Sequence, residues 1–140
     1  MIPVLAFVQH YKKFYTSQFE SAAVRHGLNQ LEIDILLFLH NNPDCNTASD
    51  IVELRGLAKS NVSTAIERLH QEGYLEVTPD RSNRRKRRLY LRPEREPVIR
   101  RLAEQQSLCL HSLTKGFTAE ELRLLHNMVD RMEENMNHAD

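Results

Sequence analysis

The sequence predicts a mainly α-helical protein with one small β-hairpin. Two short helical patterns meet at Gly56, and the second of them ends at Gly73. Two runs with alternating apolar residues then follow, and a turn crowded with arginine joins them. Glycine is typical of such helix ends because it adopts backbone conformations that other residues avoid. This order of helix, turn, helix and hairpin predicts a winged helix-turn-helix.

The first short helix shows its start and its apolar face. Thr47, followed three residues later by Asp50, resembles a capping box, in which each side chain accepts a hydrogen bond from the other residue's backbone amide. Ile51, Val52 and Leu54 supply the apolar positions. We therefore expect a helix to begin just after Thr47 and to end at the turn.

The second helix is amphipathic at a period of 3.6 residues. Its apolar arc consists of Ala58, Val62, Ala65, Ile66 and Leu69. Opposite that arc lie Ser60, Ser63, Thr64, Glu67 and Gln71, flanked by Lys59, Asn61 and Arg68. Short polar side chains suit a helix in a DNA major groove, because bulky ones would hold its backbone away from the base edges. An ordinary surface helix is the alternative, since periodicity does not encode a partner.

The hairpin concentrates positive charge. Its strands are predicted at residues 74–77 and 85–91, and Pro79 to Arg84 have the composition of a turn. From Arg81 to Arg92 there are seven Arg or Lys and no acid. The whole chain has 19 basic and 19 acidic residues, so the remainder has 12 against 19, a net charge of −7. Solubility does not require this segregation, whereas phosphate binding does.

The segments before and after the predicted winged helix-turn-helix have the patterns of long helices. We expect one helix of about 24 residues, about 36 Å long, before Gly27. Asn29 with Glu32 indicates a second capping box, and Thr118 with Glu121 a third. The apolar stripes of the terminal helices exceed what a small central domain can cover, so a second copy of the chain is their expected partner. The 140 residues are thus expected to form one domain, with a DNA-binding core at 28–92 and dimerisation helices at 1–27 and 93–140.

These features together resemble the MarR family of bacterial transcription regulators. The resemblance is carried by Leu28-Asn29-Gln30, by the run Gly56-Leu57-Ala58-Lys59-Ser60-Asn61-Val62-Ser63, by Gly73-Tyr74-Leu75 and by Asn83-Arg84-Arg85 before Leu89-Tyr90-Leu91. It implies a homodimer that binds double-stranded DNA at a pseudo-palindromic operator, most often as a repressor. The implied recognition-helix contacts are Lys59, Ser60, Asn61, Ser63, Thr64 and Arg68. The implied wing contacts are Arg81, Asn83, Arg84, Arg85, Lys86, Arg87 and Arg88, with Arg85 in the minor groove.

The sequence departs from the family pattern at three positions. Ala58 stands where the family usually has a serine, which removes a helix cap generally worth about 1 kcal/mol. Thr64 occupies a position where the family often has arginine. Asn83 replaces the wing aspartate that helps to orient the minor-groove arginine in the family. An amide can still accept a hydrogen bond but supplies no charge, which makes that orientation less secure.

A small aromatic effector is a further expectation from the resemblance. The family often binds such ligands between the dimer helices and the DNA-binding domain. The candidate lining residues here are Tyr11, Phe14, Tyr15, His26, His40 and Arg100. Aromatic side chains at helical spacing usually pack in a core, so dimer packing is the alternative for each of them.

Other functions find little support in the sequence. There is no glycine-rich phosphate loop, no nucleophile elbow and no paired histidine motif, so neither an enzyme nor a metal or cofactor site is predicted. Cys45 and Cys109 lack metal-binding spacing, and a redox sensor is not favoured. No transmembrane span or secretory signal is recognisable, and a cytoplasmic protein is expected. The rival function is a winged-helix module that binds protein partners instead of DNA.

Overall fold

The computed structural model describes residues 2–56 and 58–138, except for the side chains of Leu54 and Arg55. The roles predicted for Leu54 and Leu57 therefore lie outside the described residues. The chain divides into two compact units, residues 1–106 and 107–140, and helix α6 runs from the first into the second. Its elements are α1 Pro3–Gln18, α2 Glu20–His26, α3 Gln30–Asn41, α4 Ala48–Arg55, α5 Lys59–Gln71, β1 Leu75–Pro79, β2 Arg87–Leu91, the 3-10 helix η1 Pro93–Arg95, α6 Glu96–Leu113 and α7 Ala119–Asn137.

The prediction of one N-terminal helix up to Gly27 is wrong. The chain turns at Phe19, whose φ and ψ are −104° and −2° and whose amide donates a hydrogen bond to the carbonyl of Thr16 at 3.1 Å. The Phe19 side chain is fully buried in the core of the first unit. Apolar periodicity continues through this position, so the pattern did not reveal that the helix ends where Phe19 enters the core.

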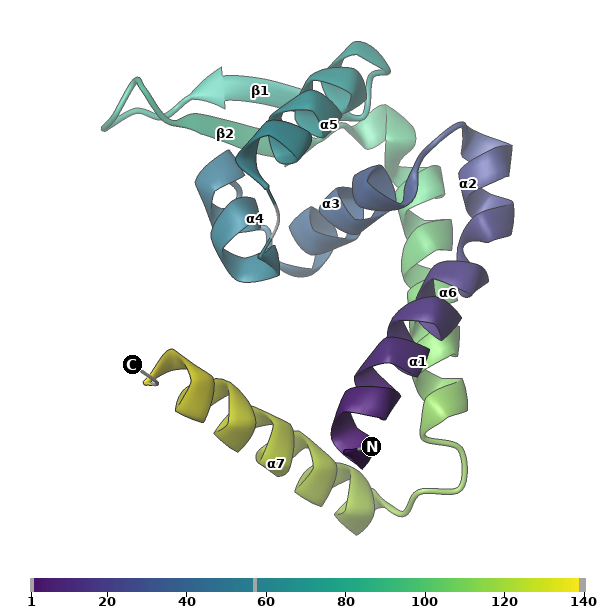
Figure 1. Ribbon diagram of the computed structural model, residues 1–140. Coiled ribbons are helices and arrows are strands. Elements are labelled where there is room, and N and C mark those ends of the chain that lie inside the picture. Colours follow the sequence, from purple (N-terminus) through teal and green to yellow (C-terminus); the bar gives the residue numbers. More distant parts are fainter. Residues whose placement is uncertain (1, 57, 139–140) are drawn as a thin grey trace. The chain divides into compact units, whose positions relative to one another are not determined.

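The helices of the predicted DNA-binding core form as expected. The capping boxes of Asn29 with Glu32 and of Thr47 with Asp50 are both complete, so the starts predicted for α3 and α4 are confirmed. Gly56 ends α4 with a φ of 63°, in the left-handed region that favours glycine. α3, α4 and α5 lie together beside the hairpin (Figure 1). Their shared core includes Ile33, Leu36, Ile51, Val62, Ala65, Leu69, Leu75 and Leu89.

The hairpin is antiparallel, with Leu75 opposite Leu91 and Pro79 opposite Arg87. Each strand begins later than predicted, and Pro79 closes β1 instead of belonging to the turn. Arg85 and Lys86 consequently lie in the loop and not on a strand. An additional bridge pairs Thr47 with Arg88, so the segment before α4 lies along the other side of β2. The fold is thus mainly helical with a two-stranded wing, which confirms the predicted fold class.

The second unit contains the end of α6 and the whole of α7. Thr118 and Glu121 complete the third predicted capping box at the start of α7. None of the described residues of α7 is buried. Its exposed apolar side chains are Leu124, Leu125, Met128, Val129, Met132 and Met136. Among the described residues, no helix combines the length and the apolar character needed to cross a membrane.

Candidate nucleic-acid interface

Helix α5 presents a polar face that is almost free of internal contacts. Because Val62, Ala65 and Leu69 of this helix are buried, its opposite side faces outward. Lys59, Ser60, Asn61, Ser63 and Thr64 are all exposed, as the sequence predicted for the recognition helix. Thr64 donates a hydrogen bond to the carbonyl of Ser60 at 3.0 Å, while the side chains of Ser60, Asn61 and Ser63 make no hydrogen bond within the described part of the chain. Their donors and acceptors are available to a partner.

The start of α5 lacks a side-chain cap, which confirms the expectation at Ala58. Ala58 occupies the N-cap position in extended conformation, and no side chain accepts a hydrogen bond from the first amides. Ala58 is itself exposed, so it does not extend the buried arc to which the periodicity assigned it. The uncapped end carries backbone amides without a side-chain cap and the positive end of the helix dipole, which together favour an anion such as a phosphate.

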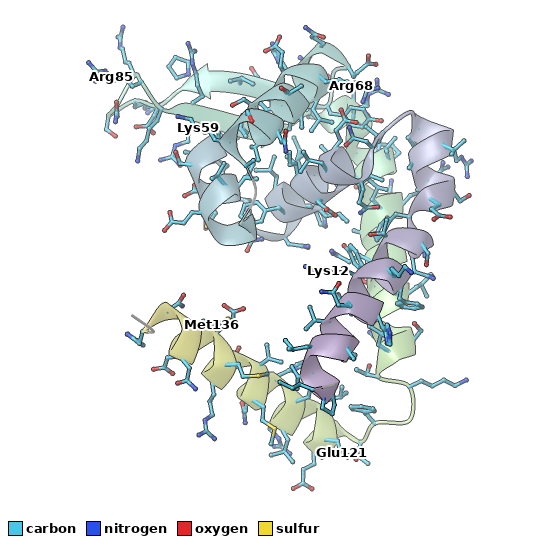
Figure 2. All side chains as sticks on the ribbon, viewed as in Figure 1. Lys12, Lys59, Arg68, Arg85, Glu121 and Met136 are labelled. Atoms are coloured by element: carbon cyan, nitrogen blue, oxygen red, sulfur yellow. The ribbon has the colours of Figure 1, made fainter. Side chains whose placement is uncertain are left out.

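Arg68 stands at the opposite end of α5 from Lys59 and is engaged within the chain (Figure 2). Its guanidinium donates to the carboxylate of Glu32 in α3 and to the carbonyl of Gly27 at 2.7 Å. Glu32 is fully buried, and its carboxylate raises the pKa of Arg68. A buried carboxylate without a cationic partner is costly, so the geometry gives Arg68 a structural role. The prediction that Arg68 contacts DNA remains untested.

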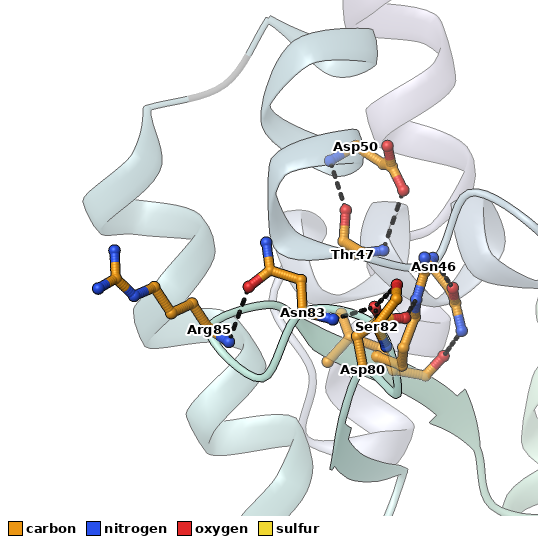
Figure 3. A network of polar contacts seen from close by, with 9 residues as sticks. Asn46, Thr47, Asp50, Asp80, Ser82, Asn83 and Arg85 are labelled. Carbon is orange, nitrogen blue, oxygen red and sulfur yellow. Dashed lines mark hydrogen bonds and ion pairs between the residues drawn. The ribbon is translucent and has the colours of Figure 1, made fainter.

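The loop of the wing is ordered by Asp80. One oxygen of its carboxylate accepts hydrogen bonds from the hydroxyl of Ser82 at 2.7 Å, from the amide of Ser82 at 3.1 Å and from the amide of Asn83 at 2.9 Å. Asn83 then accepts a hydrogen bond from the amide of Arg85 at 3.1 Å. The tip is therefore folded by side-chain contacts to its own backbone, and the Arg85 guanidinium extends away from them (Figure 3).

Arg88 fastens this loop to the rest of the domain. Its Nε donates to the other Asp80 oxygen at 2.9 Å, and a terminal nitrogen donates to Asn46 Oδ1 at 3.0 Å. Asn46 is buried and also binds β2, because its amide side chain donates to the carbonyl of Leu89 at 3.0 Å and its own carbonyl accepts from the amide of Leu89 at 2.8 Å. Hydrogen bonds from Ser82, Arg88 and Asn83 hold the pKa of Asp80 far below its usual range. Arg88 was predicted as a DNA contact; the structure gives it a bracing role, and the contact remains untested.

Two residues of this network were missed as site residues in the sequence. Asp80 had been assigned only to the turn, although an aspartate two residues before a serine is a recognisable signal for a side-chain-closed turn. Asn46 gave no local signal, because its partners Arg88 and Leu89 lie 42 and 43 residues away. Asp80 supplies at the wing the negative charge that Asn83 lacks.

The remaining charges of the wing are directed to solvent. These exposed side chains are Arg81, Arg84, Arg85, Lys86 and Arg87. No salt bridge involves them among the described residues, and Figure 2 shows Arg85 at the far tip of the hairpin. Four unneutralised cations in the loop and a fifth at the start of β2 form a surface suited to several phosphate groups.

Neither of two surface depressions in the described part of the chain brings the six candidate effector residues together. Tyr11, Phe14 and Tyr15 lie on α1, and the Tyr15 hydroxyl accepts a hydrogen bond from Gln106 at 2.8 Å. Arg100 pairs with Glu96 at 3.0 Å, and His40 is exposed at the end of α3. Of these six residues, Phe14 alone lines a depression of about 650 Å³ on α1, and none lines another of about 390 Å³ beside Gly27. The effector site remains a prediction.

The histidine and thiol groups have local environments that the sequence did not show. Burial lowers the pKa of His26, and Arg25, Arg101 and Arg95 lower it further. Burial raises the pKa of the Cys109 thiol, and Cys45 is half-buried against the core. Within the described residues no three potential ligands converge on a metal position.

Comparison with known proteins agrees with this geometry. A sequence model of the MarR family matches residues 26–86. A MarR-family transcriptional regulator from Silicibacter pomeroyi has a similar solved structure, with a TM-score of 0.84 and 16% identity over 99% of this chain and 92% of that one. A putative MarR-family regulator from Listeria monocytogenes, solved with a 26mer DNA, gives 0.84 and 16% over 97% and 90%. Bordetella bronchiseptica BpsR, whose DNA binding is regulated by 6-hydroxynicotinic acid, gives 0.71 and 18% over 93% and 98%.

Proposed function

We propose that the chain, whose residues 26–86 match the sequence model of the MarR family of transcription regulators, binds specific double-stranded DNA as a homodimeric repressor. The observation that carries the proposal is the presence of two outward surfaces on the same compact unit. One is the uncommitted polar face of α5, and the other is the exposed cationic loop of the wing.

In the proposed complex α5 lies in the major groove. Ser60, Asn61 and Ser63 are short enough to let the helix backbone approach the base edges, and Asn61 can pair with an adenine through two hydrogen bonds. Lys59 and the uncapped amides at the start of α5 bind phosphate. Thr64 contributes an acceptor and a methyl group, because its hydroxyl hydrogen is already donated to Ser60.

The wing follows the DNA backbone next to the helix. We assign Arg85 to the minor groove, because it occupies the tip of the loop and its guanidinium points away from the network that orders the loop. A narrow A·T-rich minor groove has enhanced negative potential, so Arg85 favours such sequence beside each half-site. Arg81, Arg84, Lys86 and Arg87 bind phosphates.

Dimerisation uses the terminal helices. α1 and α7 each contain no buried residue among those described, although both carry large apolar side chains. Apolar faces of this kind mark interaction surfaces, and a second copy would cover the same faces on both chains. Replacing Leu125 and Met132 with Asp should weaken the dimer in sedimentation experiments at micromolar concentration. A monomeric wild type would refute this part of the proposal.

A small aromatic effector is the proposed release signal. The regulation of BpsR by 6-hydroxynicotinic acid supports the class of ligand, and the aromatic residues of α1 support the general location. Titration of aromatic acids and phenols against the protein–operator complex tests it. An effector would lower operator affinity, whereas compounds that leave the complex intact at saturation are excluded.

Selection of bound fragments from a random DNA pool tests the central proposal. A homodimeric regulator should enrich an inverted repeat whose half-sites lie about one helical turn apart. Failure to enrich any sequence would favour the rival function, a winged-helix module that binds protein partners. Enrichment of a single half-site would support DNA recognition and contradict the dimer.

A further inference from the structure

The C-terminal end of α5 is closed partly by its own backbone and partly by an arginine side chain. Gly73 has a φ of 80° and donates to His70 at 3.1 Å, while the amide of Tyr74 donates to Leu69 at 2.9 Å. This pair of bonds is a Schellman motif, which satisfies carbonyls in the last turn. The carbonyl of Glu72, at the C-cap, is bound instead by the Arg95 guanidinium at 2.6 Å.

Arg95 comes from η1, the short turn that leads into α6. Its guanidinium carbon lies 4.4 Å from the centre of the Tyr74 ring, and Tyr74 is only 3% exposed. The amide of Arg92, just before η1, donates to the carbonyl of Tyr74 at 2.9 Å. The planar guanidinium is thus fixed by a ring on its face and by a carbonyl at its edge, a geometry that lysine cannot reproduce.

Arg68 makes a comparable contact at the C-terminal end of an earlier helix, α2. From α5 it donates to the carbonyl of Gly27, which caps the C-terminal end of α2. Arg95 in turn donates to the C-terminal end of α5. Two guanidinium groups therefore connect α2, α5 and the start of α6, each at the negative end of a helix dipole where a cation is favoured.

We propose that Arg95 is a positioning residue that fixes the direction of α5 relative to the start of α6 and thereby sets the spacing of the two half-sites. The inference rests on the proposed function, because half-site spacing has meaning only for a dimer on DNA. Arg95 itself need not touch DNA.

Helix geometry gives the expected sensitivity. α5 has 13 residues and is about 20 Å long. A tilt of about 10° at its clamped end moves its N-terminal end, which holds Lys59 to Ser63, by about 3.4 Å, and that distance equals about one base-pair step. A small increase in the freedom of α5 to tilt at Glu72 is therefore large enough to change which half-site spacing the dimer prefers.

The test compares full-length wild type with Arg95→Ala, Arg95→Lys and the matched control Arg101→Ala. Arg101 is an exposed arginine on the first turns of α6, and within the described residues it makes no side-chain hydrogen bond. Affinities are measured for inverted repeats whose spacer is varied by one and two base pairs, and for a single half-site. Circular dichroism melting reports whether each variant is folded.

Wild type and Arg101→Ala should prefer one spacing by roughly tenfold over its neighbours, and Arg95→Ala should reduce that ratio by about threefold or more. Arg95→Lys should lie between them, and it carries the test if Arg95→Ala does not fold. Single half-site affinity should stay within about twofold for all folded variants. An equal loss at every spacing, or an unchanged ratio in the folded Arg95 variants, would overturn the inference. A wild type without any spacing preference would instead refute the dimeric function on which it rests.

Discussion

The recognition helix and the wing form one proposed interface, but different forces hold them in place. α5 is held in its own domain mainly by apolar burial at Val62, Ala65 and Leu69, and the side chains on its outer face make almost no contacts. No residue between Glu76 and Arg88 of the wing is buried, and a polar network built on Asp80 shapes its loop. Loss of core packing should therefore destabilise the helix, whereas loss of the single charged pair of Asp80 and Arg88 should disorder the loop of the wing.

The largest effect should come from the core under α5. Leu69 is 0% exposed, so Leu69→Ala leaves a cavity and should lower the free energy of unfolding by about 2–5 kcal/mol. Urea denaturation measures this, with Ser63→Ala on the outer face as the control, expected to change stability by less than about 0.5 kcal/mol. Similar losses in the two variants would contradict a helix positioned mainly by its inner face.

The outer face of α5 should act on base preference and not on stability. Asn61→Ala should cost about 1–3 kcal/mol at particular base pairs, and Ser63→Ala should cost less because a hydroxyl makes a single contact. The measurement is affinity for the selected operator, for single-base variants of it and for random DNA. An equal loss on specific and random DNA would show that these side chains do not read bases.

Substitutions should distinguish wing arginines that contact phosphates from those that hold the loop in place. Arg84→Ala should flatten the log–log salt dependence of binding by about 1.8 units per dimer, between 50 and 200 mM salt. Arg85→Ala should also remove the preference for A·T-rich flanks. These variants should leave amide exchange in residues 80–87 unchanged, whereas Arg88→Ala should increase it, because Arg88 connects Asp80 to Asn46. Unchanged amide exchange in the Arg88 variant would contradict the role of Arg88 in holding the loop in place.

The smallest effect should be the response of the wing to acid. Hydrogen bonds from Ser82, Arg88 and Asn83 lower the folded-state pKa of Asp80 from its ordinary 3.8. The contribution of the Asp80 carboxylate to the stability of the wing is therefore fully present above pH 3.8 and is lost as the pH falls through the lower folded-state pKa. Amide protection in the wing, corrected for intrinsic exchange rates, should stay constant from pH 7 to pH 4. Asp80→Asn should lose protection across this range, and a wild-type loss near pH 5 would contradict the assignment.

Helix starts could be predicted because their signals are local. The three capping boxes pair residues only three positions apart, so the sequence displays both partners together. The break at Phe19 could not be found in this way. It depends on a side chain that enters a core built from distant segments, while the periodicity on either side continues.

The same distinction applies to the site. The composition of the hairpin predicted its exposed cations, because charge density is visible in a short window. It could not distinguish Arg88 from Arg84, since the partner Asn46 lies 42 residues away. Arg68 was predicted as a DNA contact for the same reason, because its partner Glu32 lies 36 residues away.

The position of Pro79 has a consequence for self-association. β1 is the outer strand of a two-stranded sheet in the described structure, and an unpaired strand edge is a template on which other chains can aggregate. Pro79 has no backbone N–H to offer at the end of β1, and the strand is only five residues long. Mutual repulsion between the cationic loops of two approaching wings opposes the same contact. The hairpin can thus project into solvent without seeding a larger sheet.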